Sequence, residues 1–188
     1  MYDSPAAQKF GSSQIYANSS LDVYLSQTFY NSLSSALQSA IVAKTFTQDS
    51  WYYNSGASGG SGNPIYQGTY QTPNNYHLGL SNATFGSSIS RKCYVLSVQD
   101  VIDYLGVTTS MGAVDTTLTS ENVWKMFWDQ TTSPGSTFPW LRSASVDDFY
   151  SAFRVYGNYG SLGYSVAVLS FAVRPAFQID LSKISWIN

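Results

Sequence analysis

The sequence is poor in the side chains from which metal centres and many catalytic sites are built. Its 188 residues include one cysteine, Cys93, and one histidine, His77. A single cysteine excludes an internal disulfide and a metal cluster held by several cysteines. The histidine has no other histidine, cysteine or carboxylate beside it in the sequence, and an isolated histidine is usually a surface hydrogen-bonding group. We therefore expect neither a metal nor a cofactor.

Charged residues are also scarce. Asp, Glu, Lys and Arg make up 11% of the chain and the formal net charge is −2, whereas a typical soluble domain has about a quarter of its residues charged. No basic run or patch is present, which argues against nucleic acid as a partner. Most of the surface must then be covered by Ser, Thr, Asn, Gln and Tyr. This composition suits a secreted or assembly-borne protein.

Long hydrophobic runs are absent as well. No apolar run approaches the roughly 20 residues that a membrane-spanning helix needs, and no signal peptide is recognisable. Hydrophobic residues still make up 44% of the chain, which is typical of a globular domain. We predict a single domain over residues 1–188, in which residues 1–17 form an extended arm over the surface.

Helical spacing of apolar residues marks the first quarter of the chain. Residues 18–20 have the chemistry of a helix N-cap, and apolar residues over 21–29 recur at the helical period. Ser34 or Ser35 caps a second, shorter helix. The β-branched and aromatic residues over 45–53 predict a strand.

The stretch 54–90 predicts no regular structure. Glycine and serine fill nearly every position from 56 to 62, and prolines and asparagines follow. The stretch is too long for an ordinary connection, so it is either a functional insertion or a mobile loop.

A buried strand and a capped helix are predicted next. Residues 93–97 are mostly apolar, and Ser97 and Asp100 have the spacing of a capping box for a helix that ends at Leu105. Asp100 and Asp103 are close enough in sequence to suggest a pair of catalytic acids. The cap explains Asp100 better, and Asp103 then belongs on the solvated face of the helix.

The most distinctive stretch is 138–177, in which two arginines lie among apolar residues. The motif Trp-Leu-Arg-Ser contains Arg142, and Val-Arg-Pro-Ala-Phe contains Arg174. A planar guanidinium can meet several backbone carbonyls or a carboxylate at once, which suits a fixed framework. Between the arginines, tyrosines are interleaved with serine, glycine and asparagine, as in antibody binding loops. Tyrosine is also a good strand residue, so these side chains could instead simply cover a sheet.

This pattern resembles the C-terminal signature of the bacterial and phage DUF6273 family. The two arginine motifs, at 140–143 and 173–177, are the most specific part of the resemblance. Residues 21–42 and 93–105 are similar to two upstream segments, so that the resemblance spans roughly residues 15–181. The family is related to proteins of the C-type-lectin fold, including the variable proteins of diversity-generating retroelements and the formylglycine-generating enzymes.

The resemblance implies that a rigid framework displays a ligand-binding region at 138–177. The framework would comprise Trp140, Arg142, Val173, Arg174 and Pro175. The implied ligand-binding residues are Ser145, Asp147, Asp148, Phe149, Tyr150, Phe153, Arg154, Tyr156, Asn158, Tyr159, Ser161, Tyr164, Leu169, Ser170 and Phe171. This mixture of aromatic, charged and small polar side chains is typical of a binding hot spot. Ala144 departs from the family pattern, in which proline is common after W-L-R-S.

The residues argue against catalysis. Formylglycine-generating enzymes use a pair of cysteines, whereas this chain has only Cys93, in a predicted core strand where a thiol is inert. His77 has no G-x-S-x-G motif to serve as the base of a serine hydrolase. A glycosidase needs two carboxylates roughly 5–10 Å apart, but Asp147 and Asp148 are adjacent and would face opposite sides of a strand.

Calcium-dependent sugar binding is disfavoured too. Calcium takes six to eight oxygen ligands, usually from several carboxylates. The E-P-N, Q-P-D and W-N-D motifs of calcium-dependent lectins do not occur. Asp147, Asp148 and Asn158 could contribute a weak site at most.

We therefore predict an α+β domain of C-type-lectin-like fold, with short helices flanking a small twisted antiparallel β-sheet and much irregular loop. Its expected function is non-catalytic recognition of a protein or glycan ligand on a cell surface through residues 145–171. We expect an extracellular location, on a bacterial surface or a phage tail, within a larger protein or assembly. The alternatives are an oxidoreductase of the formylglycine-generating type and a structural component of a phage tail or surface appendage.

Overall fold

The structure is a computed structural model that describes residues 7–53, 65–67, 88–105, 113–114, 139–145, 150–156 and 161–184. These residues form an α+β fold with short helices and mostly antiparallel strands, as the sequence predicts. His77 and most of the stretch 54–90 lie outside the described residues. The parts of this stretch that are described, 65–67 and 88–90, belong to strands, whereas the sequence predicts no regular structure there.

The helices and strands are short. The helical segments are α1 (Ser20–Val23), the π-helical η1 (Tyr24–Phe29), α2 (Tyr30–Ser32), α3 (Ser35–Ala40), α5 (Val98–Leu105) and the 3-10 helix η3 (Leu181–Lys183). The main sheet is built from β4 (Ser50–Tyr53), β5 (Ile65–Gln67), β7 (Ala113–Val114), β8 (Trp140–Ser145), β9 (Ser151–Tyr156) and β10 (Ser161–Val166). The remaining strands are β1 (Gln8–Lys9), β2 (Ile41–Val42), β3 (Lys44–Thr47), β6 (Ser88–Arg91), β11 (Ser170–Phe171) and β12 (Gln178–Ile179).

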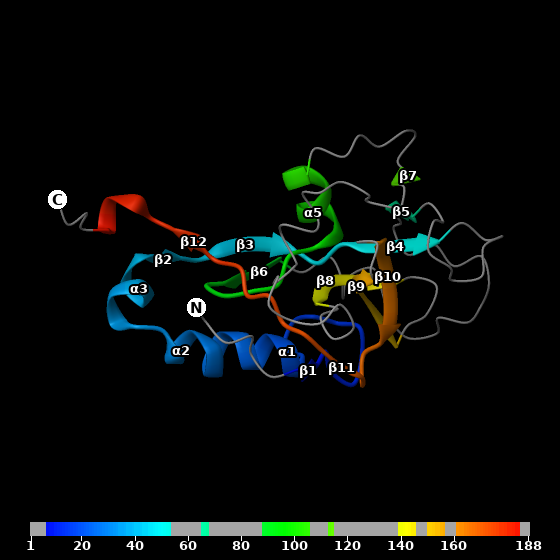
Figure 1. Cartoon of the computed structure of the whole chain (residues 1–188), viewed down its shortest axis with the longest axis horizontal. Helices are drawn as coiled ribbons and strands as arrows, with labels where there is room; N and C mark the ends of the chain where they lie inside the picture. The colour runs from blue at the N-terminus through cyan, green and yellow to red at the C-terminus, as the bar shows by residue number, and fades with distance from the viewer. Residues whose placement is uncertain are drawn as a thin grey trace.

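The main sheet has the strand order β10-β9-β8-β4-β5-β7, in which the β4–β8 pair is parallel. Three small antiparallel pairs accompany it: β1 with β11, β2 with β12, and β3 with β6. The main sheet lies at one end of an elongated molecule, and α3, β12 and η3 lie at the other end (Figure 1).

The predicted helix caps are present. The Ser19 hydroxyl accepts a hydrogen bond from the Asp22 amide at 3.1 Å, at the start of α1. At the start of α3, the Ser34 hydroxyl accepts one from the Leu37 amide at 3.3 Å, so Ser34 rather than Ser35 is the cap. Of the helices in the described parts of the chain, none combines the length and apolar character needed to cross a bilayer.

The strand predicted over 45–53 is in fact two strands, β3 and β4, which belong to different sheets. The buried side chain of Gln48 occupies the break between them. Its amide nitrogen donates to the carbonyls of Gln14 and Arg142 at 2.7 and 2.9 Å, and its amide oxygen accepts from the Tyr16 amide at 2.8 Å. Gln48 therefore satisfies backbone groups that no strand partner reaches.

The N-terminal residues also depart from the prediction. Instead of lying over the surface, the described residues from 7 to 17 bring Phe10, Gln14 and Tyr16 into the core, where all three are fully buried. The Phe10 ring lies edge-on to Trp140 with ring centres 5.5 Å apart. Phe10 and Tyr16 are isolated aromatic residues in a polar stretch, so no periodic pattern in the sequence predicts their burial.

Residues 93–97 are buried as predicted, apart from the half-buried Leu96, but they do not form a regular strand. Cys93, Tyr94 and Val95 lie in the core, and only Tyr94 pairs, in an isolated bridge with Ala176. The two backbone hydrogen bonds of this bridge are 3.0 and 2.7 Å long. A short apolar run therefore predicted burial correctly and secondary structure incorrectly.

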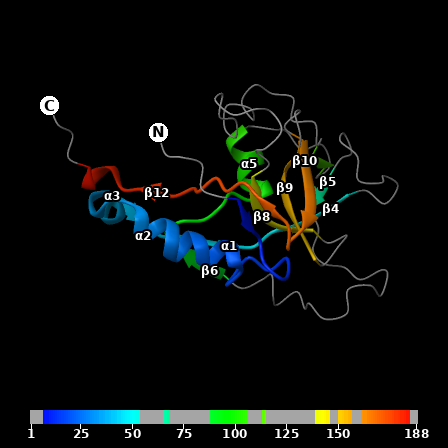
Figure 2. The same ribbon diagram turned by 60° about the horizontal axis from the view of Figure 1, so that its bottom comes forward.

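The main sheet carries a hydrophobic cluster on each face. Leu141 and Phe153 pack with α5 on one face, and Trp140 and Ala152 pack with the N-terminal residues and the first helices on the other. Successive residues of β8 and β9 thus point into different clusters, as the pleat of a strand requires. Figure 2 shows α5 beside β8 and β9.

Candidate ligand-binding site

Arg142 lies inside the molecule, where it is only 3% exposed. One of its terminal nitrogens, Nη1, donates to the Val95 carbonyl at 2.8 Å and to the Asp100 carboxylate at 2.5 Å. Its guanidinium lies 4.2 Å from the centre of the Phe46 ring. The partners expected for this arginine are several backbone carbonyls or a carboxylate, and Arg142 has one partner of each kind.

Asp100 connects this arginine to the start of α5. Its carboxylate accepts from the Ser97 amide at 3.0 Å, and its own amide donates to the Ser97 hydroxyl at 2.9 Å, which completes the predicted capping box. The carboxylate also accepts from Lys44 at 3.0 Å. Burial alone would raise the pKa of Asp100, but its bonds to Arg142, the Ser97 amide and Lys44 outweigh burial and lower that pKa. Asp100 therefore holds three segments together as a carboxylate.

Asp49 plays a similar part between β3 and β4. Its carboxylate accepts from the Ser143 hydroxyl at 2.6 Å and from the Trp51 indole at 2.7 Å. The Ser143 hydroxyl in turn accepts from the Val98 amide at 2.8 Å. These polar side chains form two hydrogen-bonded groups, which we call together the polar frame. It comprises the half-buried Lys44 and Asp49 and the buried Asp100, Arg142 and Ser143.

The second arginine motif runs beside the first. The Trp140 amide donates to the Ala172 carbonyl at 3.1 Å, and Val173 is fully buried. Arg174 and Pro175 are half-buried. The two motifs therefore meet in space, as expected of framework residues.

A second arginine, Arg154, is buried in β9. Its guanidinium lies 4.2 Å from the centre of the Phe171 ring, and its Nε donates to the Ser165 hydroxyl at 2.5 Å. The Phe171 ring meets Trp140 edge-on, with ring centres 4.9 Å apart. This stack connects β8, β9, β10 and β11.

Four neutral side chains are exposed at and beside the turn between β10 and β11. Tyr150, Val166, Val168 and Leu169 are 51%, 42%, 51% and 48% exposed. The Ala167 amide donates to the Tyr150 carbonyl at 2.7 Å, which brings Tyr150 to the turn that carries the three aliphatic residues. We call these four residues the ridge.

Only part of the predicted ligand-binding set is exposed at or beside the ridge. Tyr150, Leu169 and Ser170 are exposed, whereas Tyr164 and Phe171 are half-buried. The side chains of Tyr156 and Ser161 are not among those described, although both residues lie in strands. The predicted residues outside the described part of the chain are Asp147, Asp148, Phe149, Asn158 and Tyr159.

Three predicted contact residues lie inside the molecule. Ser145 and Phe153 are fully buried, and Arg154 is nearly so. The sheet is covered on both faces at this point, so the side chains of β8 and the described side chains of β9, residues 151–155, are all buried. In this structure the three residues therefore do not form part of the surface.

Two residues of the ridge, Val166 and Val168, were not among the predicted contacts. They flank the buried Ala167, and this valine-alanine-valine alternation is the one signal that could have revealed them.

No sequence signal predicts the partly buried ion pair between Asp22 and Arg91, whose two N–O contacts are both 2.7 Å long. The two residues are 69 positions apart, so only folding brings them together.

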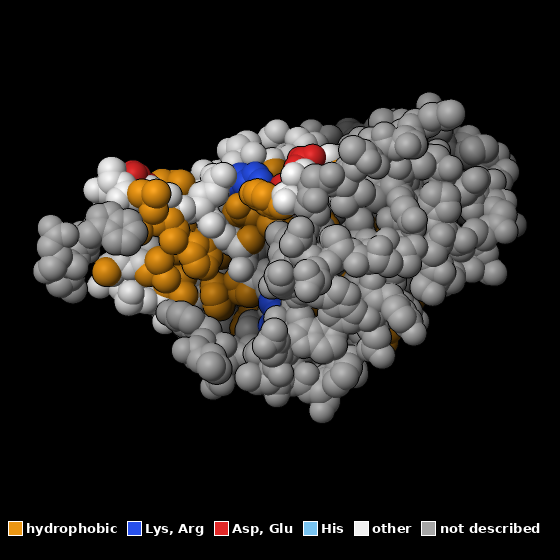
Figure 3. Space-filling view, turned by 45° about the horizontal axis from the view of Figure 1, so that its top comes forward, with side chains coloured by type: hydrophobic (Ala, Val, Ile, Leu, Met, Phe, Trp, Pro, Cys, Tyr) orange, Lys and Arg blue, Asp and Glu red, His pale blue; other side chains and the backbone are white. Residues whose placement is uncertain are grey.

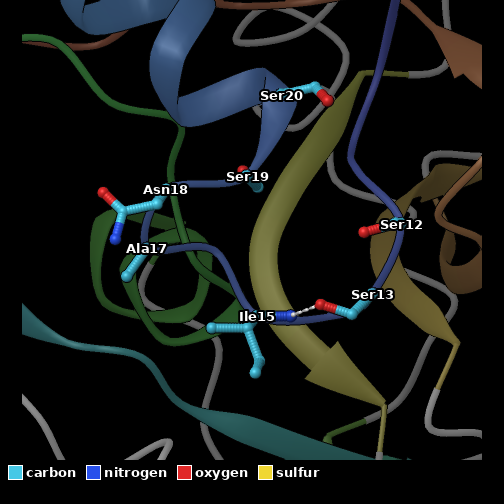
Figure 4. Close-up of a pocket in the computed structure, with 7 residues that line it drawn as sticks. All are labelled: Ser12, Ser13, Ile15, Ala17, Asn18, Ser19 and Ser20. Carbon is cyan, nitrogen blue, oxygen red and sulfur yellow. Dashed lines mark hydrogen bonds between the residues drawn. The ribbon is translucent and has the colours of Figure 1, made fainter.

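A small open pocket of about 210 Å³ lies on the loop that leads into α1. Its lining is mostly hydroxyls and small side chains, with Asn18 held in the left-handed backbone region at a φ of 61° (Figure 4).

Among the residues that the structure describes, no group of three His, Cys, Asp or Glu side chains could hold a metal. Burial raises the pKa of the Cys93 thiol to about 11, so it is protonated at neutral pH.

Hydrophobic side chains also gather at the far end of the molecule, which carries β12 and η3 (Figure 3). Ile179 and Leu181 are 37% and 64% exposed there. This surface provides a control for experiments on the ridge, because it has similar chemistry at a different place in the fold.

The sequence pattern of the family described as Domain of unknown function (DUF6273) matches residues 2–181, nearly the whole chain, and the chain therefore belongs to this family. No curated protein and no solved structure matches the chain. The match includes both arginine motifs and the ridge between them.

Proposed function

We propose that this chain is a non-catalytic binding module that recognises a protein partner through the ridge. The observation that carries the proposal is the exposure of four adjacent neutral side chains at one turn, each 42% to 51% exposed. Single exposed apolar residues are common on proteins, but adjacent ones frequently mark interaction sites.

The chemistry of the ridge favours a protein over a glycan. Val166, Val168 and Leu169 are aliphatic and no ridge residue is charged, which suits the apolar centre of a protein interface. The exposed Ser170 and half-buried Ser165 beside them could supply part of a polar rim. A sugar would need several hydrogen-bonding groups at the centre, where Tyr150 offers one hydroxyl.

The support beneath the ridge also fits a binding role. The Arg154 stack connects β10 and β11, which flank the ridge turn, to β9 and β8, and the polar frame in turn fixes β8. A surface that is already ordered loses less conformational entropy when it binds. The frame thereby supports recognition without contacting the partner.

We also propose the finer relationship that the arginine motifs suggest: a C-type-lectin-like fold, related to the variable proteins of diversity-generating retroelements, on a bacterial surface or phage tail. A near-copy of the codons for residues 140–175 beside a reverse-transcriptase gene, with adenines where the two copies differ, would support this relationship. A gene neighbourhood with neither feature would count against diversification but leave the binding proposal intact.

The binding proposal is tested with binders selected from a protein-display library against the wild-type chain. We expect Leu169→Ser to weaken most selected binders roughly tenfold or more, as loss of an interface anchor does. Leu181→Ser removes an exposed leucine at the far end of the molecule and serves as the matched control. If the binders depend on Leu181 and are indifferent to Leu169, the ridge is not the recognition surface.

A further inference from the structure

The N-terminal residues 8–11 lie beside the ridge turn and contact it through their backbone. β1 pairs with β11, so that Gln8 lies opposite Phe171 and Lys9 opposite Ser170. The Gly11 amide donates to the Ala167 carbonyl at 3.1 Å. The Ala167 amide donates to the Tyr150 carbonyl, so the backbone of the buried Ala167 is hydrogen-bonded on both sides.

Residues 8–11 are themselves anchored to the core. The Phe10 carbonyl accepts from the Leu21 amide at 3.0 Å, at the start of α1, and the Gln8 carbonyl accepts from the Trp140 indole at 2.8 Å. The buried Phe10 ring packs against Trp140 as described above. The segment therefore connects the first helix and the Trp140 stack to the ridge turn.

Gly11 allows this close approach without crowding. A Cβ atom at this position would lie 3.3 Å from the Cβ of Ser19, which is tighter than an ordinary carbon–carbon contact. A branched side chain here would have to be accommodated by a shift of this segment or of Ser19, and we expect such a shift to strain the hydrogen bond to Ala167.

From these contacts we propose that residues 8–11 are a positioning element for the ridge. They fix Ala167, and Ala167 sets the places of Tyr150 and of the two valines beside it. Displacing the segment loosens the ridge turn while the main sheet remains folded. The consequence for binding depends on the proposed function, whereas the positioning of the turn does not.

Amide hydrogen exchange measured by NMR tests the positioning directly, in Gly11→Val and in Gly11→Val combined with Ser19→Gly. We expect exchange at the Ala167 and Leu169 amides to accelerate roughly 10- to 100-fold in the single variant, as local opening becomes easier. The Val101 amide in α5 should change by less than about twofold, because a global loss of stability would accelerate it too. Removing the Ser19 side chain should restore much of the protection, since glycine is tolerated at an N-cap.

Uniform acceleration at all three amides, or unchanged exchange at Ala167 and Leu169, would overturn the positioning role. If Gly11→Val does not fold, Gly11→Ala replaces it, with a several-fold effect expected at the same amides. The selected library binders supply the second measurement, and we expect the single variant to weaken those that require Leu169. Unchanged affinity with a loosened turn would refute the link to binding, whereas failure to obtain Leu169-dependent binders would count against the proposed function and leave the exchange result standing.

Discussion

The polar frame and the ridge differ in almost every physical property, although β8, β9 and β10 connect them. The frame places charged side chains inside the molecule and pairs them, as Arg142 does with Asp100. The ridge places neutral, mostly aliphatic side chains outside. Charge is thus used for internal architecture and apolar surface for display, the reverse of the usual arrangement. The two regions should respond differently to substitution, the frame through stability and the ridge through binding.

The largest effect is expected for Asp100→Ala, which leaves the guanidinium of Arg142 buried without its carboxylate. Breaking a buried ion pair in this way costs about 3–5 kcal/mol of unfolding free energy, which urea unfolding would measure. Asp103→Ala, on the exposed face of the same helix, is the control and should change stability by less than about 0.5 kcal/mol. Equal losses for the two aspartates would remove the special role of the frame.

A smaller effect is expected for Ala144→Pro, at the position where the family commonly has proline. The Ala144 amide donates to the Asp49 carbonyl at 3.0 Å, and proline has no amide hydrogen. Leaving the carbonyl of the half-buried Asp49 without this donor should cost roughly 1–3 kcal/mol. Ala144→Gly keeps the amide and should cost about 1 kcal/mol or less. If proline were tolerated without loss, this strand would not depend on the bond to Asp49.

The frame should also make stability fall in acid. Because the pKa of Asp100 in the folded state is lowered from its ordinary 3.8, its carboxylate stabilises the fold above that pH, and this contribution is lost as pH falls through the folded-state pKa. Urea unfolding between about pH 5 and pH 2 should show a smaller loss in Asp100→Ala than in the wild type. Asp103→Ala should keep the wild-type dependence. A profile that is identical in all three proteins would place the acid sensitivity elsewhere.

The smallest effect on stability is expected in the ridge. Leu169→Ser should change the unfolding free energy by less than about 0.5 kcal/mol, because the side chain already contacts water. Leu162→Ser, in the buried part of the neighbouring strand, should cost several kcal/mol because it creates a cavity and buries a hydroxyl, roughly 2–5 kcal/mol in comparable cores. Thermal unfolding of both variants would separate display residues from core residues. A large loss for Leu169→Ser would assign the ridge to the core.

Local chemistry made parts of the fold predictable. The cap at Ser19 and the capping box of Ser97 with Asp100 depend on residues three positions apart, so sequence spacing is sufficient to find them. The interior placement of Arg142 followed from an arginine set among large apolar residues. The sequence could not show which carboxylate it meets, since Asp100 is 42 positions away.

Alternation patterns were less informative where the sheet is covered on both faces. Phe153 and Arg154 are consecutive and both are buried, so no polar-apolar alternation separated core residues from displayed ones. The break at Gln48 and the burial of Phe10 escaped prediction for a related reason. Each depends on partners from distant segments.

The amino-acid sequence therefore specifies the α+β class, the helix caps, the absence of cysteine chemistry beyond Cys93 and the framework role of the arginine motifs, because these depend on composition and short spacing. The fold decides which residues between the motifs reach the surface. It buries Ser145, Phe153 and Arg154 and exposes Val166 and Val168. It also brings residues 8–11 beside the ridge turn. These outcomes depend on contacts between segments far apart in the chain, which only packing in three dimensions can establish.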